Sequence, residues 1–270
     1  MKTGLLISTY NWPEALDSVL RSIALQTLLP DEILIADDGS GQQTKSVIER
    51  FRKGQTLPVK HIWQEDNGFR KSAILNKSVA ATEADYIIQI DGDCIPHPDF
   101  IKDHIAGIEE NTFLYGSRVN IKPEAIQKAL TMKIPRFTLL STSINNKSRN
   151  LRIPIFQKLY SPKSRFSSKT RGCNLSYWRK DYIAVNGYNE TMEGWGREDS
   201  EFVLRLLNNK VKGKRLRYGG IVYHIFHPEK SKEFLERNSE IQDRTIKEQI
   251  KWCENGVDKY LKDFGKDPRI

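Results

Sequence analysis

Short apolar runs alternate with amphipathic segments through the first 91 residues, and this alternation constrains the fold more than any other feature. The runs at 4–9 and 32–37 are short and nearly continuous in apolar residues, as expected for parallel strands buried on both faces, and two further strands are expected at 58–64 and 85–91. Helical spacing separates them, for example in residues 12–30, where Pro13 starts the helix and Pro30 follows it. This order predicts an α/β protein with a doubly wound, Rossmann-like sheet.

The pattern loosens after residue 120. Residues 131–172 are rich in Ser, Lys, Arg and Asn, and we expect a helical segment that leads into a mobile basic loop. A strand-like segment then covers 215–227, and a charged segment predicts a C-terminal helix from about 231 to 263.

The composition is typical of a globular protein in a reducing compartment. The chain has 270 residues, of which 38% are hydrophobic and 29% charged, and no apolar run approaches the roughly 20 residues of a membrane helix. The N-terminus resembles a first strand and shows no secretory cleavage site. The three cysteines have no CxxC spacing, so neither a disulfide framework nor a zinc cluster is indicated. We therefore expect a reducing, cytoplasmic setting.

The formal charge of +9 favours an anionic partner. That partner could be nucleic acid, an acidic membrane surface or a phosphate-bearing substrate. The charge alone does not choose among them.

Two carboxylates, Asp91 and Asp93, lie where the run at 85–91 ends, with a glycine between them. In an open sheet, ligands commonly bind beyond the carboxyl ends of the strands. Two neighbouring carboxylates raise each other's pKa unless a cation or hydrogen-bond donors offset the repulsion. The pattern indicates a divalent metal site, and an acidic loop without a ligand is the alternative.

Other polar residues follow the remaining strands and meet the same edge of the predicted sheet. Thr9 and Tyr10 follow the first strand, Asp38 follows the second, and Arg70 lies beyond the third. Together they offer an aromatic face, a carboxylate and a cation, which suit a nucleotide. Taken singly, Asp38 is also an ordinary turn residue and Arg70 an ordinary solvated helix start.

Three blocks of the sequence resemble the inverting GT-A glycosyltransferases of family 2. They are "ISTYNWPEALDSVLRSIALQTLLPDEILIADDGS", "NGFRKSAILNKSVAATEADYIIQIDGDCIPHPDF" and "GWGREDSEFVLRLL". The third block is also similar to β-galactosyltransferase-like and chondroitin-polymerase-like enzymes. The resemblance covers about 3–118 and 170–228.

The resemblance implies a GT-A fold with a mixed sheet and a division of the chain. A catalytic domain would span 1–230, with a nucleotide-binding half at 1–120 and an acceptor half at 121–230. Residues 231–270 would form a C-terminal helical extension.

The resemblance also implies roles on the donor side. Tyr10 would stack on the uracil of a UDP-sugar, with Thr9 beside it, and Asp38 would accept from the base. Arg70 would reach a donor phosphate or the base. Asp91 and Asp93 match the DxD motif, with Asp93 as the direct ligand of Mn²⁺ or Mg²⁺ and Asp91 shared with ribose.

On the acceptor side, the resemblance implies that Asp199 is the general base. Glu198 would bind acceptor hydroxyl groups or orient that base, and Trp195 would offer a flat face to a sugar ring. His224 would complete the metal site, with His227 as the second choice. A pair of histidines at a strand end is otherwise more often structural.

The predicted function is therefore inverting, metal-dependent transfer from a nucleotide-sugar, UDP-linked by expectation, to a saccharide or lipid-linked acceptor in cell-surface glycan synthesis. Peripheral contact with the anionic inner face of the cell membrane would use the basic charge. A nucleotidyltransferase or sugar-nucleotide pyrophosphorylase is one alternative, but the first strand lacks the Gly-rich phosphate loop expected after it. A nucleic-acid-binding module is another, but the basic residues are spread over many segments, so no nucleic-acid partner is predicted.

Overall fold

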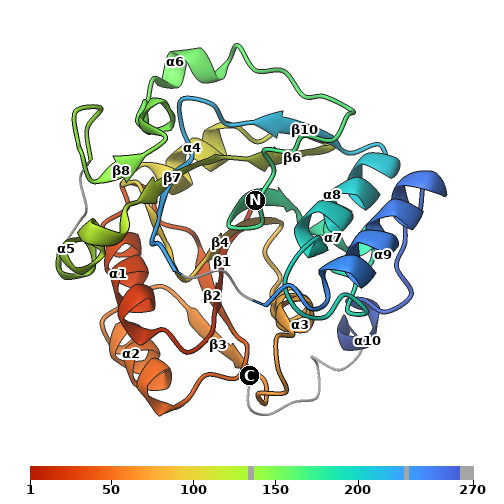
Figure 1. Ribbon diagram of the computed structural model, residues 1–270, viewed down its shortest axis with the longest axis horizontal. Helices are drawn as coiled ribbons and strands as arrows, with labels where there is room; N and C mark the ends of the chain where they lie inside the picture. The colour runs from red at the N-terminus through yellow and green to blue at the C-terminus, as the bar shows by residue number, and fades with distance from the viewer. Residues whose placement is uncertain (133–136, 228–230, 262–270) are drawn as a thin grey trace.

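The computed structural model describes residues 1–132, 137–227 and 231–261, and a mixed sheet lies at its centre (Figure 1). Within this described part, seven strands pair in the order β10-β6-β9-β4-β1-β2-β3. The strands that run parallel to one another are β1 (Thr3–Thr9), β2 (Glu32–Asp37), β3 (Val59–Trp63), β4 (Tyr86–Asp91), β6 (Thr112–Tyr115) and β10 (Lys212–Arg215). Strand β9 (Asn174–Trp178) runs antiparallel between β4 and β6.

The four strands predicted in the first 91 residues are confirmed. Every residue of β1 and β2 is buried, in agreement with their continuous apolar runs. The strand order reverses at β1, which has β2 on one side and β4 on the other. This reversal is the place where an open α/β sheet commonly binds its ligand.

A second, smaller sheet stands beside the first (Figure 1). Its strands, in spatial order, are β5 (Cys94–Pro96), β11 (Ile221–His224), β7 (Ser117–Ile121) and β8 (Ile144–Asn145). Strand β5 leaves the loop that carries Asp91 and Asp93, and it pairs antiparallel with β11. The pairing of Cys94 with His224 brings a histidine from the end of the chain to this loop.

Helices cover both faces of the central sheet, as a doubly wound fold requires. One apolar core lies under α1 (Pro13–Ile23), α2 (Gln42–Lys53) and α4 (Phe100–Ala106), and α5 (Ile126–Thr131) adds to it. The other lies under α3 (Lys71–Ala80), α7 (Arg179–Ala184) and α8 (Glu198–Asn208). Figure 1 shows these two groups of helices on opposite sides of the sheet.

The middle of the chain contains more structure than the sequence predicts. Residues 131–172 were expected to begin with a helix and continue as a loop, but helix α5 lies before this segment and shares only Thr131 with it. The segment also contains β8, the 3-10 helix η2 (Lys147–Asn150) and the short helix α6 (Pro154–Gln157), while η1 (Pro123–Ala125) precedes α5. Residues 133–136 of this segment lie outside the described residues.

Two predicted elements are divided in the structure. The strand-like segment at 215–227 contains the end of β10 and the whole of β11, which belong to different sheets. Tyr218 and Gly220, with φ of 66° and 52°, turn the chain between them. The predicted helix at 231–263 becomes α9 (Leu235–Lys247) and α10 (Asp258–Leu261), because the chain turns at Gln249 with φ of 51°. The end of that prediction, residues 262 and 263, lies outside the described residues.

The C-terminal helices pack on the rest of the protein. Helix α9 contacts α8, and α10 contacts α3. Asn238 of α9 is fully buried, and its Nδ2 donates to the carbonyl oxygens of Glu193 (2.9 Å) and Gly196 (3.0 Å). The domain division at residue 230 stays a prediction, since 228–230 are outside the described residues.

Candidate functional site

Two adjacent strands, β1 and β4, bring their carboxyl ends together at the reversal of strand order. Ser8 pairs with Asp91 in the β-ladder, and Ser8 Oγ donates to Asp91 Oδ1 at 2.7 Å. Gly92 follows, and its N–H donates to the Ser8 carbonyl oxygen at 2.7 Å. The loop that bears Asp91 and Asp93 is therefore fixed to the end of β1.

Lys71, the first residue of α3, links this loop to Glu198 and Asp199, the residues predicted on the acceptor side. Its Nζ lies 2.7 Å from Asp91 Oδ1, and its side chain is only 13% exposed. Burial alone would lower the pKa of Lys71, but the charges of Asp91, Asp199 and Glu198 overcome this effect and hold the pKa well above its ordinary value. One buried cation thus faces carboxylates from both halves of the predicted site.

The residues predicted to bind a base come together at the ends of β1 and β2, where the Asp38 N–H donates to the Thr9 carbonyl oxygen at 3.0 Å and the charge of Asp38 acts on Tyr10. Tyr10 is 42% exposed, and its hydroxyl donates to Asp66 Oδ2 at 2.8 Å, which raises the pKa of Tyr10. Asp38 accepts from the Arg70 backbone N–H at 2.8 Å and from the side chain of Gln64. Burial, opposed by these hydrogen bonds, raises the pKa of Asp38. The Arg70 guanidinium donates to the Glu65 carbonyl oxygen at 2.7 Å, so its reach to a phosphate stays a prediction.

Asp93 meets both candidate histidines. Its Oδ2 lies 3.3 Å from His227 Nε2 and 3.6 Å from His224 Nε2, and one ligand atom from each residue falls within 4.8 Å of the others. Burial alone would raise the pKa of Asp93, but the hydrogen bond with His227 and the charge of His224 lower it. The carboxylate of Asp91 is engaged by Ser8 and Lys71, so its part in a metal site stays a prediction.

A network of buried polar groups holds Asp199. Its Oδ2 accepts from the Gly172 N–H at 2.8 Å, and its Oδ1 accepts from the Tyr188 hydroxyl at 3.3 Å. A Cβ at position 172 would lie 2.0 Å from Asp199 Oδ1, so only glycine permits this approach. Gln89 in the middle of β4 donates to Tyr188 Oη (2.9 Å) and to the Gly172 carbonyl oxygen (3.1 Å), which positions both partners of Asp199.

The loop before α8 presents Trp195 and Glu198. Trp195 is 39% exposed, between glycines with φ of 68° and 111°. A Cβ at Gly194 would lie 2.4 Å from Phe234, so this loop packs closely on the start of the C-terminal helices. Glu198 is buried, and its Oε2 accepts from the Gly196 N–H at 2.9 Å. Burial and the charge of Asp199, opposed by Lys71, raise the pKa of Glu198 to about 7.

The raised pKa of Glu198 predicts a pH dependence of stability. Between pH 4.5 and 7 the native carboxyl keeps a proton that the unfolded chain releases, so stability falls as the pH rises through this window, by up to about 1.4 kcal/mol per pH unit. Urea unfolding at intervals from pH 4.5 to 8 measures this slope. In Glu198→Gln the slope should become smaller, because the buried carboxyl group with the raised pKa is removed. Equal slopes would contradict the buried, protonated Glu198.

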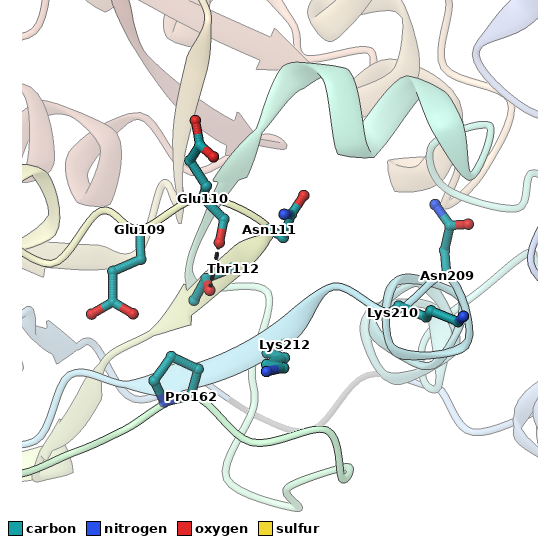
Figure 2. A pocket seen from close by; sticks show the side chains of 8 residues that line it. All are labelled: Glu109, Glu110, Asn111, Thr112, Pro162, Asn209, Lys210 and Lys212. Carbon is teal, nitrogen blue, oxygen red and sulfur yellow. Dashed lines mark hydrogen bonds between the residues drawn. The ribbon is translucent and has the colours of Figure 1, made fainter.

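A separate hollow of about 510 Å³ lies at the opposite end of the sheet (Figure 2). Thr112 and Lys212, the first residues of β6 and β10, line it together with Glu109, Glu110 and Lys210. Figure 2 shows these side chains projecting from separate segments of the chain around the hollow. Because the hollow lies at the amino ends of the parallel strands, it is remote from the residues described above.

The sequence of this chain matches known families over most of its length. Residues 5–185 match the profile described as glycosyl transferase family 2, and residues 155–228 match one described as the N-terminal domain of galactosyltransferase. The chain belongs to glycosyl transferase family 2. This membership favours glycosyl transfer over the nucleotidyltransferase and nucleic-acid-binding alternatives.

Two curated relatives of this family 2 chain are longer than it is. Hyaluronan synthase of Pasteurella multocida is 25% identical over 247 residues, which cover 85% of this chain and 25% of the synthase. Validoxylamine A glucosyltransferase of Streptomyces hygroscopicus subsp. limoneus is 25% identical over 215 residues, covering 75% of this chain and 47% of that enzyme. The chain thus spans between a quarter and a half of these relatives.

Solved structures share the GT-A fold with this family 2 chain. Staphylococcus aureus TarS 1-349 in complex with UDP-GlcNAc has a TM-score of 0.63 and 19% identity, covering 98% of this chain and 71% of TarS 1-349. Mannosyltransferase PcManGT from Pyrobaculum calidifontis, in complex with GDP-Man and Mn²⁺, has a TM-score of 0.56 and 14% identity, covering 83% of this chain and 56% of that protein. The predicted GT-A fold is confirmed.

Sequence reasoning missed several residues of the site. Gln89 carried a signal, since a glutamine in the middle of a buried apolar strand needs hydrogen-bond partners. Tyr188 and Gly172 carried no such signal, because they approach Asp199 only through the folded chain.

Among the described residues, no helix has both the length and the apolar character needed to cross a bilayer, and membrane contact stays a prediction.

Proposed function

We propose that this family 2 chain is an inverting, metal-dependent glycosyltransferase that uses a UDP-linked sugar and a saccharide or lipid-linked acceptor. The observation that carries the proposal is the convergence of Asp91, Asp199 and Glu198 around Lys71 at the reversal of strand order, with Asp93, on the same loop as Asp91, beside its two histidines. Nucleotide-sugars held by the similar structures, UDP-GlcNAc and GDP-Man, support the donor class.

Manganese fits the candidate metal site better than magnesium. Asp93, His224 and His227 offer one carboxylate and two imidazoles within reach of one ion. Magnesium prefers oxygen ligands in octahedral geometry, whereas imidazole nitrogen is a ligand of transition metals, so the two histidines favour Mn²⁺, a transition metal, over Mg²⁺. When bound there, the ion would neutralise charge on the departing diphosphate.

The chain's own residues would then divide the work of direct displacement. Tyr10 and Asp38 would hold the base, and Lys71 keeps Asp91 oriented beside the donor. Asp199 would take the proton of the acceptor hydroxyl as the acceptor oxygen forms its bond to the anomeric carbon and the diphosphate leaves. Gly172 and Tyr188 fix the Asp199 carboxylate, so little reorientation is needed.

Isothermal titration with UDP, GDP and CDP, each with and without Mn²⁺, tests this proposal directly. We expect UDP to bind, with an affinity that rises at least about tenfold with Mn²⁺, because the ion would offset diphosphate charge in a partly buried site. GDP and CDP should bind more weakly under both conditions. Absence of binding for every nucleotide would refute the proposed function, and a preference for GDP would refute the UDP-linked donor.

A further inference from the structure

Five arginines have no role in the proposed donor site or in proton transfer by Asp199. They gather near the candidate site. They come from β7, η2, the segment before β9, the end of β10 and the turn after it, and they are Arg118, Arg149, Arg171, Arg215 and Arg217. We call them the arginine cluster. Burial and the charges of the other four together lower the pKa of Arg149, which shows that they lie within electrostatic reach of it.

Contacts join the arginine cluster to the candidate site. Arg149 Nη1 donates to the Arg118 carbonyl oxygen at 3.2 Å. On the paired strands β7 and β11, Arg118 is opposite Val222 and Asn120 is opposite His224, so Arg118 and Asn120 flank the metal candidate on one face. Arg171 directly precedes Gly172, whose N–H holds Asp199.

The arginine cluster forms no direct ion pair in the described residues, although the charge of Asp91 acts on Arg118. Within residues 1–132, 137–227 and 231–261, none of its arginines has a carboxylate oxygen within 4.0 Å, although nearby Arg152 pairs with Asp99 and Asp103. Gathering several guanidinium groups costs free energy unless an anion binds there. The Arg217 guanidinium stacks over the Tyr218 ring, 4.9 Å from its centroid, which holds one of these charges in place.

Two buried polar atoms beside the cluster also have no partner in the described structure. They are Oδ1 of Asn120 and Oγ1 of Thr170, the residue next to Arg171. A buried polar atom without a hydrogen bond is unfavourable, and each of the two could gain a partner from a ligand hydroxyl group once a small local movement uncovers it. The surface is therefore suited to a ligand that carries both negative charge and hydroxyl groups.

We propose that the arginine cluster binds a phosphate group of the acceptor, which would be a phosphorylated sugar or polyol. A phosphate group carries one negative charge as a diester and up to about two as a monoester, and its several acceptor oxygens can bind more than one guanidinium group, which a single carboxylate does less well. The position next to Gly172 places this group on the side of Asp199, where the acceptor hydroxyl must lie. This inference rests on the proposed function and names the acceptor class for the same site.

The test measures binding to the full chain saturated with UDP and Mn²⁺. The probes are a glycerol-phosphate polymer, hyaluronan oligosaccharides, neutral dextran and phosphatidylglycerol vesicles. Wild-type protein should bind the glycerol-phosphate polymer best, and more weakly as salt increases. The variant Arg149→Gln/Arg217→Gln should bind it at least about tenfold more weakly, since charged hydrogen bonds are lost. UDP affinity should not change.

A matched control removes two charges elsewhere. Lys45 and Lys53 are exposed on α2, and Lys45→Gln/Lys53→Gln should bind polymer and UDP as the wild type does. Unchanged polymer binding in the arginine variant, or no polymer binding by the wild type, would overturn the inference. Stronger binding of hyaluronan, dextran or vesicles than of the glycerol-phosphate polymer would also overturn it. A loss of UDP affinity in the arginine variant would do the same. Failure of the wild type to bind UDP would instead refute the proposed function.

Discussion

Asp199→Asn should lower sugar transfer by a factor of about 100 to 10,000 while leaving UDP affinity nearly intact. The factor is the usual contribution of a positioned general base, which asparagine cannot replace. Asparagine fits the same space, because its Oδ1 can accept from the Gly172 N–H and its Nδ2 can donate to the Tyr188 hydroxyl. Steady-state transfer rates and UDP titration, measured on the same preparation, separate the two effects.

The control for this substitution is Asp243→Asn. Asp243 is exposed on α9 and lies outside the candidate site, so it changes the net charge equally and should retain full activity. A wild-type rate in Asp199→Asn would exclude Asp199 as the base, and Glu198, with a pKa raised to about 7, would become the better candidate. A collapse of UDP affinity would place Asp199 in the nucleotide site instead.

The first half of the fold could be predicted from local patterns. Strands β1, β2 and β4 are buried on both faces, so their sequences are almost entirely apolar and their ends are easy to recognise. The carboxyl ends of such strands share one edge, which is why Asp91 and Asp38 could be assigned to one region before the structure was known. The division of 215–227 between two sheets could not be predicted, since both pieces look like one extended segment.

Much of the candidate site depends on contacts between distant segments. Arg70 was the cation expected at the donor, yet it is the neighbouring Lys71 that reaches Asp91, because the first turn of α3 directs the two side chains differently. The arginine cluster comes from segments up to about 100 residues apart, and no spacing within the sequence signals it. The histidines at 224 and 227 were assigned to the metal site through the family resemblance, because a pair of histidines at a strand end is by itself more often structural.

Asp93→Ala should abolish the manganese-dependent part of UDP binding and, with it, metal-dependent transfer. Asp93 is the carboxylate that brings His224 and His227 within reach of one ion, so its loss removes the only negative charge among these three ligands. We expect Mn²⁺ affinity to fall on the order of 100-fold or more, because loss of a residue that only hydrogen-bonds to a metal ligand already lowers metal affinity by up to about 100-fold. Electron paramagnetic resonance of free Mn²⁺ measures this affinity without relying on activity.

Two comparisons make the result for Asp93 specific. Asp243→Ala removes a remote exposed carboxylate and should leave Mn²⁺ binding unchanged, which controls for net charge. His224→Ala and His227→Ala should each weaken Mn²⁺ binding. The two histidines lie at similar distances from Asp93, 3.6 and 3.3 Å, so the larger loss of affinity identifies the stronger ligand. If Asp93→Ala kept wild-type Mn²⁺ affinity and transfer, the cation would have to bind elsewhere, and the Asp91 carboxylate held by Lys71 would be the next position to examine.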